Sequence, residues 1–284
     1  NPFLRIFSML SFSIIIFISY FSLKKNRADI TIVNSPPLLS GFFGALLGRL
    51  VSKRVVTNVS DIWPLSALEL GAIKRGTFYT LLEFIERKMY NISDALISQS
   101  VETKNHISNL APNKNVFLYR NIPRPNLFAG NFKRDERFRI IYAGLLGVAQ
   151  GVLNIIKNIN FQVIGAELHL YGDGNEKESI LQYLRDNPNC NIIYNGMIEP
   201  NEIDKLMPTY DVSLIPLTSN IYGAFPSKIF AAISAGLPIL FSGLGEGKSF
   251  VIENDLGLVN DPNKYCDLVN NIKQLMDLDK EEYV

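Results

Sequence analysis

Residues 139–174 read RIIYAGLLGVAQGVLNIIKNINFQVIGAELHLYGDG. Two short apolar runs in this stretch, Arg139–Tyr142 and Glu167–Tyr171, are typical of buried strands, and a glycine-containing turn follows each of them. The residues between the two runs are expected to form a helix. A strand, a helix and a second strand in this order predict a βαβ unit with parallel strands.

The same alternation continues in both directions along the chain. Toward the C-terminus the sequence predicts four more strands and a final helix, at Asn191–Tyr194, Val212–Ile215, Pro238–Phe241, Gly257–Val259 and Asn263–Met276. Toward the N-terminus it predicts four strands, at Asp29–Val33, Arg54–Val59, Ala95–Ser98 and Val116–Tyr119. A helix is expected over Thr77–Met89, with an inward face made of Phe78, Leu81, Leu82, Ile85 and Met89. Strands that alternate with helices imply an α/β fold with parallel sheets.

A stretch without this alternation separates two halves. Residues 121–138, NIPRPNLFAGNFKRDERF, contain two prolines, a glycine and a charge cluster, which is typical of a linker. We therefore expect a first domain over residues 1–130 and a second over residues 131–284. Because the first half offers only four strands, and because the chain starts at Asn1 and stops within a helical pattern, we expect portions to be missing at both ends.

The composition is that of a folded protein. With 47% apolar and 19% charged residues, the 284-residue chain does not fit a disordered protein, and Cys190 and Cys266 lack the spacing of metal ligands and are expected to be free thiols. Residues 1–130 hold 15 Lys and Arg against 7 Asp and Glu, whereas the whole chain has a net charge of +1. Because the basic residues form scattered pairs without a nucleic-acid motif, a phospholipid surface fits this half better than nucleic acid.

Residues 6–23, IFSMLSFSIIIFISYFSL, carry no charge. Their length is at the lower edge of what spans a bilayer, about 17–25 residues. We expect a helix that is buried against a sheet or dips into one face of a membrane, with a spanning helix as the alternative. Together with the basic first half, this stretch predicts peripheral contact with a membrane.

Glycine-containing turns follow several strands of the second half. In doubly wound sheets, ligands bind at the carboxyl ends of the strands, where free backbone amides favour phosphate groups. Plain tight turns are the alternative interpretation of each motif. Glu246, in the later Gly243–Gly247 turn, could accept hydrogen bonds from sugar hydroxyl groups. The other candidates are Gly144, Gly147, Gly172, Asp173 and Gly174.

The segment YGAFPSKIFAAISAGLP, residues 222–238, gives the most specific signal. Pro226 and Ser227 are expected to open a helix, with Ser227 as its cap. Lys228 then occupies the first helical position, where the helix dipole disfavours a cation. This conflict indicates an anionic ligand next to Lys228; a solvated lysine is the alternative.

Asp61 and Trp63 follow a strand of the first half, in the motif SDIWP. Asp61 is either a helix N-cap or a carboxylate of the site, and Trp63 is a candidate for one wall of a cleft. His106 and His169 have no partner at metal-ligand spacing, and His169 lies within a strand, so we expect a structural role for it and no metal site.

Together these segments resemble the retaining glycosyltransferases of family four, which have the GT-B fold of two Rossmann-like, doubly wound domains facing a cleft. The likeness is to enzymes of bacterial polysaccharide and O-antigen assembly. The matching stretches occur in family order and are SDIWP, YAGLLGVAQG, LYGDGNE, NGMI (residues 195–198), DVSLIPL, FPSKIFAAISAGLPILFSG, GEG and NDLGLV.

The resemblance implies that the second domain holds a nucleotide-sugar donor and the first domain an acceptor. It places Lys228 on the donor diphosphate, at the helix that Pro226 and Ser227 open, with the Gly144–Gly147 loop near the same phosphates. Residues 172–174 would lie near the nucleoside, Met197 and Ile198 beside the base, and Asp61 would face the reacting sugar. It further implies that no metal is needed, because cationic side chains and helix ends stabilise the leaving diphosphate.

The sequence departs from the family pattern at five positions. Many relatives carry two glutamates where this chain has Gly223 and Ala231, and an arginine and a lysine where it has Leu145 and Gln150. Ser60 stands where some relatives have a histidine. These departures leave Lys228 as the only predicted phosphate cation.

The sequence therefore predicts an enzyme that transfers a hexose or N-acetylhexosamine from a nucleoside diphosphate sugar, preferably of UDP, with no cofactor. The expected acceptor is a lipid-linked or polysaccharide glycan at the inner, cytoplasmic face of the cell membrane. A sugar-nucleotide epimerase of the same architecture and a non-catalytic two-lobed binding protein are the alternatives. A nicotinamide oxidoreductase is disfavoured because no G-x-G-x-x-G motif follows a strand.

Overall fold

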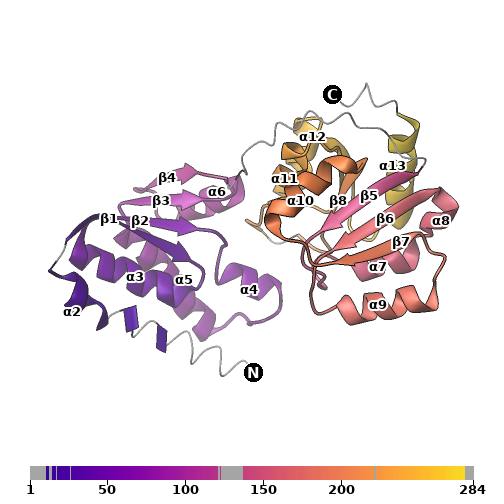
Figure 1. Cartoon of the computed structure of the whole chain (residues 1–284). Helices are drawn as coiled ribbons and strands as arrows, with labels where there is room; N and C mark the ends of the chain where they lie inside the picture. The colour runs from indigo at the N-terminus through magenta and orange to yellow at the C-terminus, as the bar shows by residue number, and fades with distance from the viewer. Residues whose placement is uncertain are drawn as a thin grey trace. The chain divides into compact units, whose positions relative to one another are not determined.

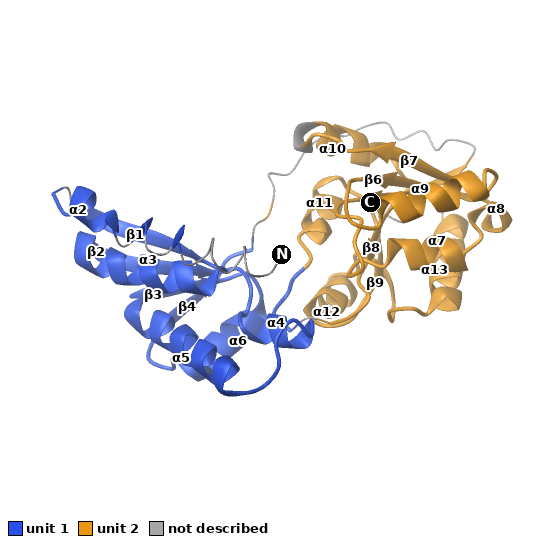
Figure 2. Ribbon diagram, turned by 90° about the horizontal axis from the view of Figure 1, so that it is seen from below, with its two compact units in different colours: residues 1–121, 221–225 blue, residues 122–220, 226–284 orange. Residues whose placement is uncertain are grey.

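The computed structural model of the chain describes residues 11–12, 15–16, 18–25, 27–120, 122, 137–220 and 222–278. The chain divides into unit 1, Asn1–Asn121 with Ile221–Phe225, and unit 2, Ile122–Asn220 with Pro226–Val284 (Figure 2). The short strip 221–225 therefore belongs to unit 1, although the residues on both sides of it belong to unit 2. The predicted boundary between residues 130 and 131 lies outside the described residues.

Unit 1 is built on a parallel sheet with the order β1-β2-β3-β4. Its strands are β1 (Ala28–Ser35), β2 (Ser52–Val59), β3 (Ala95–Ser98) and β4 (Asn115–Leu118). The helices that connect them are α3 (Leu38–Val51), α4 (Leu65–Glu69), α5 (Thr77–Ile92) and α6 (Val101–Leu110). Because every connection leads to the next strand in the same direction, right-handed crossovers place the connecting helices on one face of the sheet, as Figure 1 shows for α3 and α5.

The helix predicted at residues 77–89 forms, but its expected inward face is wrong at two positions. Phe78 and Leu81 are 59% and 53% exposed, whereas Leu82 and Met89 are buried as expected. The buried side also contains Glu86, whose carboxylate accepts hydrogen bonds from Tyr90 Oη at 2.7 Å and from His106 Nε2 at 2.9 Å. Glu86 is buried because its carboxylate has hydrogen-bond partners there. The side of α5 that carries Glu86 therefore faces inward, and not the side that hydrophobicity alone predicts.

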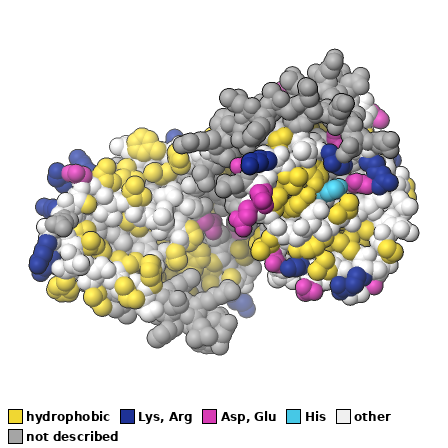
Figure 3. All heavy atoms as spheres, viewed as in Figure 1, with side chains coloured by type: hydrophobic (Ala, Val, Ile, Leu, Met, Phe, Trp, Pro, Cys, Tyr) yellow, Lys and Arg dark blue, Asp and Glu magenta, His cyan; other side chains and the backbone are white. Residues whose placement is uncertain are grey.

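Other large apolar side chains of unit 1 are exposed as well. Ile30 and Ile32 on β1 are 57% and 68% exposed, and Phe117 on β4 is 59% exposed. Figure 3 shows hydrophobic side chains spread over the face of unit 1 that is turned to the viewer, with basic side chains at its edge.

Unit 2 is built on a six-stranded parallel sheet with the order β10-β9-β8-β5-β6-β7. Its strands are β5 (Phe138–Ala143), β6 (Ala166–Tyr171), β7 (Ile192–Gly196), β8 (Val212–Pro216), β9 (Ile239–Ser242) and β10 (Gly257–Asn260). Counted along the chain, this is the doubly wound order 6-5-4-1-2-3. The winding direction reverses between β5 and β8, which pair through Ile140–Val212 and Ile141–Ser213. Such a reversal is where open α/β sheets bind ligands.

Helices cover both faces of this sheet. They are α7 (Val152–Asn158), α8 (Phe161–Ile164), α9 (Lys177–Asp186), α10 (Pro200–Leu206), α11 (Lys228–Ser234), α12 (Glu246–Glu253) and α13 (Tyr265–Asp277), with the 3₁₀ helix η1 (Met207–Thr209). Side chains of α7, α9 and α13 fill one buried core with β5, β6 and β8. In α13, Leu268, Ile272 and Leu275 are buried as the sequence predicted. Both units thus have the parallel α/β architecture that the sequence predicts.

The apolar stretch 6–23 lies partly outside the described residues. Its described part is helical in places, ends in α2 (Tyr20–Leu23), and α2 contacts α3. Among the residues that the structure describes, no helix has both the length and the apolar character needed to cross a bilayer. Both cysteines are free: Cys190 is half-buried and Cys266 is exposed.

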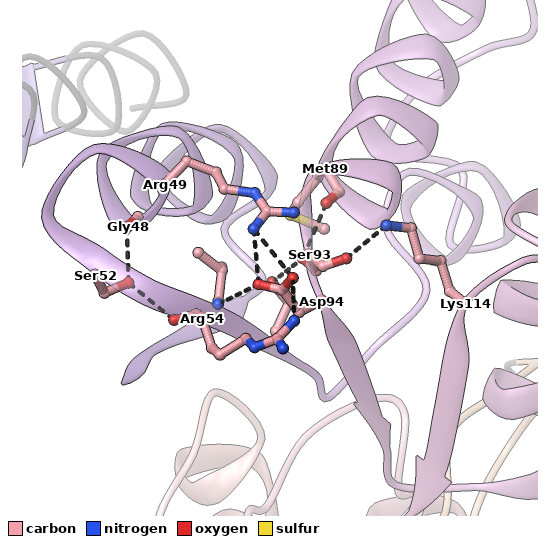
Figure 4. A network of polar contacts seen from close by, with 10 residues as sticks. Gly48, Arg49, Ser52, Arg54, Met89, Ser93, Asp94 and Lys114 are labelled. Atoms are coloured by element: carbon pink, nitrogen blue, oxygen red, sulfur yellow. Dashed lines mark hydrogen bonds and ion pairs between the residues drawn. The ribbon is translucent and has the colours of Figure 1, made fainter. Parts of the chain in front are cut away.

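Asp94 joins three elements of unit 1 (Figure 4). Its carboxylate accepts hydrogen bonds from the Val55 amide at 2.7 Å and from Arg49 Nη1 at 2.9 Å, and it lies 3.4 Å from Arg54 Nη1. Partial burial alone would raise the pKa of Asp94, but the amide and the two guanidinium groups outweigh it and hold the pKa below its ordinary value. The network therefore links α3 and β2 to the start of β3.

We expect Asp94→Asn to lower the free energy of unfolding by about 1–2 kcal/mol at neutral pH, because it removes charge-assisted hydrogen bonds. A lowered folded-state pKa gives stability that is full above the unfolded-state pKa, about 3.9, and is lost as the pH falls through the folded-state value. Urea unfolding at pH 7 and at pH 3 measures both effects. The matched control is Asp29→Asn, which breaks only the exposed Lys53–Asp29 pair and should change little; an equal loss in both variants would contradict the expectation.

Candidate functional site

A cavity of about 470 Å³ lies at the point where the winding of unit 2 reverses. Apolar side chains of β5, β8, α10 and η1 form much of its wall, among them Ile141, Leu214, Ile203 and Met207. Six residues predicted from the sequence also line it: Gly144, Gly172, Asp173, Met197, Ile198 and Lys228. The turns after β5, β6 and β7 and the first residue of α11 thus meet around one space, at the carboxyl ends of the strands.

The turns after β5 and β6 fit against each other so closely that Gly172 and Gly174 have no room for a side chain. The Gly144 amide donates to the Tyr171 carbonyl at 2.9 Å, and the Leu146 amide donates to the Asp173 carbonyl at 2.9 Å. Gly172 has φ +138°, and a Cβ there would overlap the carbonyl group of Gly144. The two turns are therefore joined by backbone hydrogen bonds into one closely packed unit at the edge of the cavity.

Lys228 points into this space over Gly144. Its Nζ lies 3.5 Å from Tyr142 Oη and 4.8 Å from the centre of the Tyr142 ring. A Cβ on Gly144 would lie 2.5 Å from Lys228 Nζ, so the lysine can take this path only because residue 144 is glycine. Burial lowers the pKa of Lys228 to about 8.

The electrostatics of Lys228 favour an anion. Among the described residues, no carboxylate forms a hydrogen bond or an ion pair with Lys228; its polar contact is the Tyr142 hydroxyl. A buried ammonium without a counter-charge is costly, as its lowered pKa shows, and an anion bound in the cavity would remove that cost.

Asp173 is tied to its own turn. Its carboxylate accepts a hydrogen bond from the Gly174 amide at 2.7 Å and lies 3.3 Å from Lys177 Nζ. The Gly174 amide, followed by Lys177, lowers the pKa of Asp173, so the group is ionised at neutral pH. A Cβ on Gly174 would collide with the Leu146 carbonyl, which gives this glycine a structural role.

Five predicted donor-site residues, Gly147, Gly174, Pro226, Ser227 and Glu246, do not line the cavity. Gly147 begins the turn that leads into α7, where its carbonyl accepts the Gln150 amide. Ser227 is the N-cap residue of α11 and Lys228 its first helical residue, as predicted, but the Ser227 side chain makes no capping hydrogen bond. Glu246 opens α12 after β9.

Sequence reasoning missed the aromatic residues of the site. Tyr142 is fully buried under Lys228. Its position directly before the glycine turn could have indicated from the sequence that it belongs to the site. Tyr171 lines the cavity, and its hydroxyl lies 2.9 Å from the hydroxyl of Tyr210, which in turn lies 3.0 Å from His169 Nδ1. Burial lowers the pKa of His169 despite the nearby Glu167 carboxylate, which fits the structural role expected for this histidine.

Asp61 and Trp63 belong to unit 1. Asp61 Oδ2 accepts a hydrogen bond from Ser66 Oγ at 3.0 Å, and Oδ1 is buried without a hydrogen-bond partner among the described residues. The N-cap of α4 is Pro64, so Asp61 is not the helix cap that was one of its two predicted roles. Trp63 is partly buried against the core of unit 1.

Gly223, where many relatives carry a glutamate, lies in the strip of unit 1 that precedes α11. Its amide donates to Glu102 at 2.7 Å, and its carbonyl accepts from Ser100 Oγ at 2.8 Å and Thr103 Oγ1 at 3.0 Å. With φ +87°, a Cβ there would lie 2.5 Å from Ile62 Cδ1. The tight fit explains why this chain has glycine at the position.

Within the described part of the chain, no three His, Cys, Asp or Glu side chains come together in an arrangement that could hold a metal ion. His106 instead pairs with the buried Glu86. The absence of a metal requirement stays a prediction from the sequence.

We expect Gly144→Ala to push the Lys228 side chain out of its path and to return the pKa of Lys228 from about 8 toward its ordinary value. The pH dependence of acylation of Lys228 by acetic anhydride, followed by mass spectrometry, measures this pKa. The control is Gly236→Ala, where the glycine also has a positive φ of +66° but there is open space around the new Cβ. Its Lys228 should keep the low pKa; a folded Gly144→Ala protein that also keeps it would refute the steric argument.

Comparison with known proteins agrees with this architecture. The sequence model of the family described as Glycosyl transferases group 1 matches residues 137–278, half of the chain. A search of curated protein sequences finds no significant match.

Three solved structures illustrate the likeness of fold. S. aureus TarM, a variant in complex with fondaparinux, alpha-GlcNAc-glycerol and UDP, is 18% identical, with a TM-score of 0.65 over 93% of this chain and 52% of TarM. The lipopolysaccharide outer core galactosyltransferase WaaB is 17% identical, with a TM-score of 0.63 over 94% of this chain and 71% of WaaB. Anabaena HepE in complex with UDP is 13% identical, with a TM-score of 0.67 over 92% of this chain and 72% of HepE. The chain thus spans about half the length of TarM.

Proposed function

Because the chain belongs to the glycosyl transferases group 1 family, we propose that it is a glycosyltransferase whose unit 2 binds the diphosphate of a nucleotide-sugar donor at Lys228. The observation that carries the proposal is the partly buried Lys228 ammonium, which has no carboxylate partner among the described residues and lines a cavity at the winding reversal. A donor diphosphate supplies the anion that this position lacks.

The preferred donor is a UDP-sugar with a hexose or N-acetylhexosamine. Two similar folds, TarM and HepE, were solved with UDP. In this chain, Met197 and Ile198 offer apolar contact for a base, and the Gly172 turn lies beside them in the same cavity. The Gly144 turn would lie against the phosphates that Lys228 binds.

The proposed reaction keeps the configuration at the anomeric carbon. The acceptor hydroxyl attacks that carbon on the side from which the diphosphate leaves; the carbon–oxygen bond to the diphosphate breaks, and the released diphosphate oxygen takes the hydroxyl proton. Lys228 offsets the charge that grows on the diphosphate, so no metal is required. Asp61 of unit 1, whose Oδ1 has no partner among the described residues, is the proposed acceptor of a hydrogen bond from the reacting sugar, and Glu246 binds sugar hydroxyl groups.

The proposed acceptor is a lipid-linked sugar or a growing polysaccharide, in the synthesis of a cell-surface glycan such as lipopolysaccharide. The similar fold of WaaB, a lipopolysaccharide outer core galactosyltransferase, supports this acceptor class. The excess of basic residues in the first 130 residues supports a peripheral position at the inner, cytoplasmic face of the membrane.

We expect Lys228→Met to weaken UDP binding by about tenfold to a hundredfold, because it removes one charge-assisted contact with phosphate. Isothermal titration calorimetry with UDP measures the affinity. Lys273→Met, which removes an exposed lysine of α13, is the matched control and should bind UDP like the unaltered protein. Equal affinity in all three proteins would remove Lys228 from the donor site.

UDP binding is also expected to take up protons at alkaline pH. Burial lowers the pKa of the free Lys228 to about 8, and a bound diphosphate raises it, so between these two values binding protonates the amine. Affinity should therefore fall as the pH rises above about 8. Calorimetry at pH 8.5 in buffers of different ionisation enthalpy detects the uptake, which should vanish in Lys228→Met. Proton uptake that persists in that variant would assign it to another group.

Product analysis separates the proposal from its alternatives. With a UDP-sugar and a lipid-linked acceptor, a glycosyltransferase gives an extended acceptor and UDP. An epimerase gives an altered sugar from the donor alone, and a binding protein gives neither. We expect Lys228→Ala to lower turnover by the protein far more than it lowers the melting temperature.

A further inference from the structure

Helix α5 carries a row of large apolar side chains on its exposed side. Phe78, Leu81 and Phe84 are 59%, 53% and 56% exposed. Because they follow each other at intervals of three residues, they lie along one side of the helix. Single exposed apolar residues are ordinary on protein surfaces, whereas a contiguous row marks a site of interaction.

The folded state of unit 1 requires this row to face outward. The opposite side of α5 buries Met89 and Tyr90, together with Glu86, which is 1% exposed. Turning α5 to bury Leu81 and Phe84 would expose Met89 and break the hydrogen bonds that Tyr90 and His106 donate to Glu86. The outward row is thus fixed by the contacts of the inward side.

The charges around the row are basic. Lys74 and Arg75 precede α5, and Arg87 and Lys88 lie in its second half; all four are exposed, and Lys88 Nζ lies 5.3 Å from the centre of the Phe84 ring. Glu83 is the one exposed carboxylate within residues 74–92. An apolar row bordered by lysine and arginine matches a bilayer with anionic lipids, because the rings enter the interface while the cations stay at the headgroups. A second copy of the chain fits poorly, since like charges would meet.

The described part of residues 11–25 repeats the pattern. Phe12, Ile15, Ile18 and Phe21 are 55–67% exposed, again at intervals of three. Lys24 Nζ lies 5.4 Å from the centre of the Phe21 ring. Because α2 contacts α3 and α3 contacts α5, Phe21 on α2 and the row on α5 belong to the same helical layer of unit 1.

We propose that the outward row of α5, Phe78, Leu81 and Phe84, docks onto a lipid bilayer that contains anionic lipids, with Arg87 and Lys88 at the headgroups. The inference deepens the membrane contact put forward under the proposed function by naming the surface that makes it. Lipid binding needs neither donor nor acceptor, so its failure and the failure of sugar transfer can be told apart.

The test is sedimentation of the full chain with vesicles of phosphatidylcholine, with or without phosphatidylglycerol. The unaltered protein should bind the mixed vesicles and bind pure phosphatidylcholine weakly. The double variant Leu81→Gln/Phe84→Gln should lose affinity for the mixed vesicles by about tenfold or more. Arg87→Gln/Lys88→Gln should lose most of the preference for phosphatidylglycerol.

The matched control is Ile32→Gln/Phe117→Gln, which removes two equally exposed apolar residues from the sheet of the same unit. It should bind the mixed vesicles like the unaltered protein. An equal loss in this control, or no loss in the α5 variant, overturns the proposal. Circular dichroism checks that each variant is folded. Folding should be retained, because the altered side chains are exposed and contribute little to the core.

A second measurement locates the contact directly. In a Trp63→Phe background, Phe84→Trp should shift its fluorescence to shorter wavelength when mixed vesicles are added, because the indole leaves water. Phe117→Trp in the same background should not shift. A tryptophan at residue 84 that stays in water while the protein sediments with the vesicles rules out α5 as the docking surface.

Discussion

The site of unit 2 depends on one steric constraint: the Lys228 side chain passes across residue 144, which must be glycine because a side chain there would block the path. Gly144 leaves room for the ammonium above the Tyr142 ring, and Gly172 lets the neighbouring turn close against Gly144 from the other side. The cation is thereby held in a partly buried position without a counter-charge from the described residues, which costs stability. A bound anion would remove this cost, so the site favours an anionic ligand. The two glycine turns thus contribute to binding of the proposed diphosphate by holding Lys228 in this position.

In unit 1, a buried carboxylate determines which side of a helix meets solvent. Glu86 is satisfied by a tyrosine and a histidine, so the inner side of α5 is more polar and the outer side more apolar than in an ordinary surface helix. The same physical principle applies in both units: a polar or charged group away from water needs a partner, and its partner, or the lack of one, determines what the surroundings bind. In unit 2, Lys228 lacks a charged partner among the described residues and favours an anion. In unit 1, Glu86 has its partners inside, and the apolar side of α5 is left at the surface.

The sequence predicted the elements well, because buried parallel strands and glycine turns leave strong local signals. The strand at Ala95–Ser98 was placed with its observed bounds, and six predicted site residues line one cavity because parallel strands bring their carboxyl ends to one edge. It failed where a distant side chain decides. Glu86 pairs with His106, 20 residues away, and this pairing places on the outside of α5 two residues that were expected inside. Lys228 packs over Tyr142, which is 86 residues away in the sequence. The bare N-cap at Ser227 and the role of Gly223 likewise depend on backbone geometry and on contacts with remote residues.

The strip that ends at Phe225 affects how the protein can assemble during synthesis. Its backbone is held by Glu69, Glu102, Ser100 and Thr103, and the Phe225 ring lies 4.5 Å from the Arg120 guanidinium. Unit 1 therefore cannot be completed when the ribosome has reached residue 121; it must wait until residues 122–220 of unit 2 and the strip itself have also emerged. Domains usually fold in the order of their translation, but here the earlier unit stays unfinished until a late piece of nascent chain returns to it.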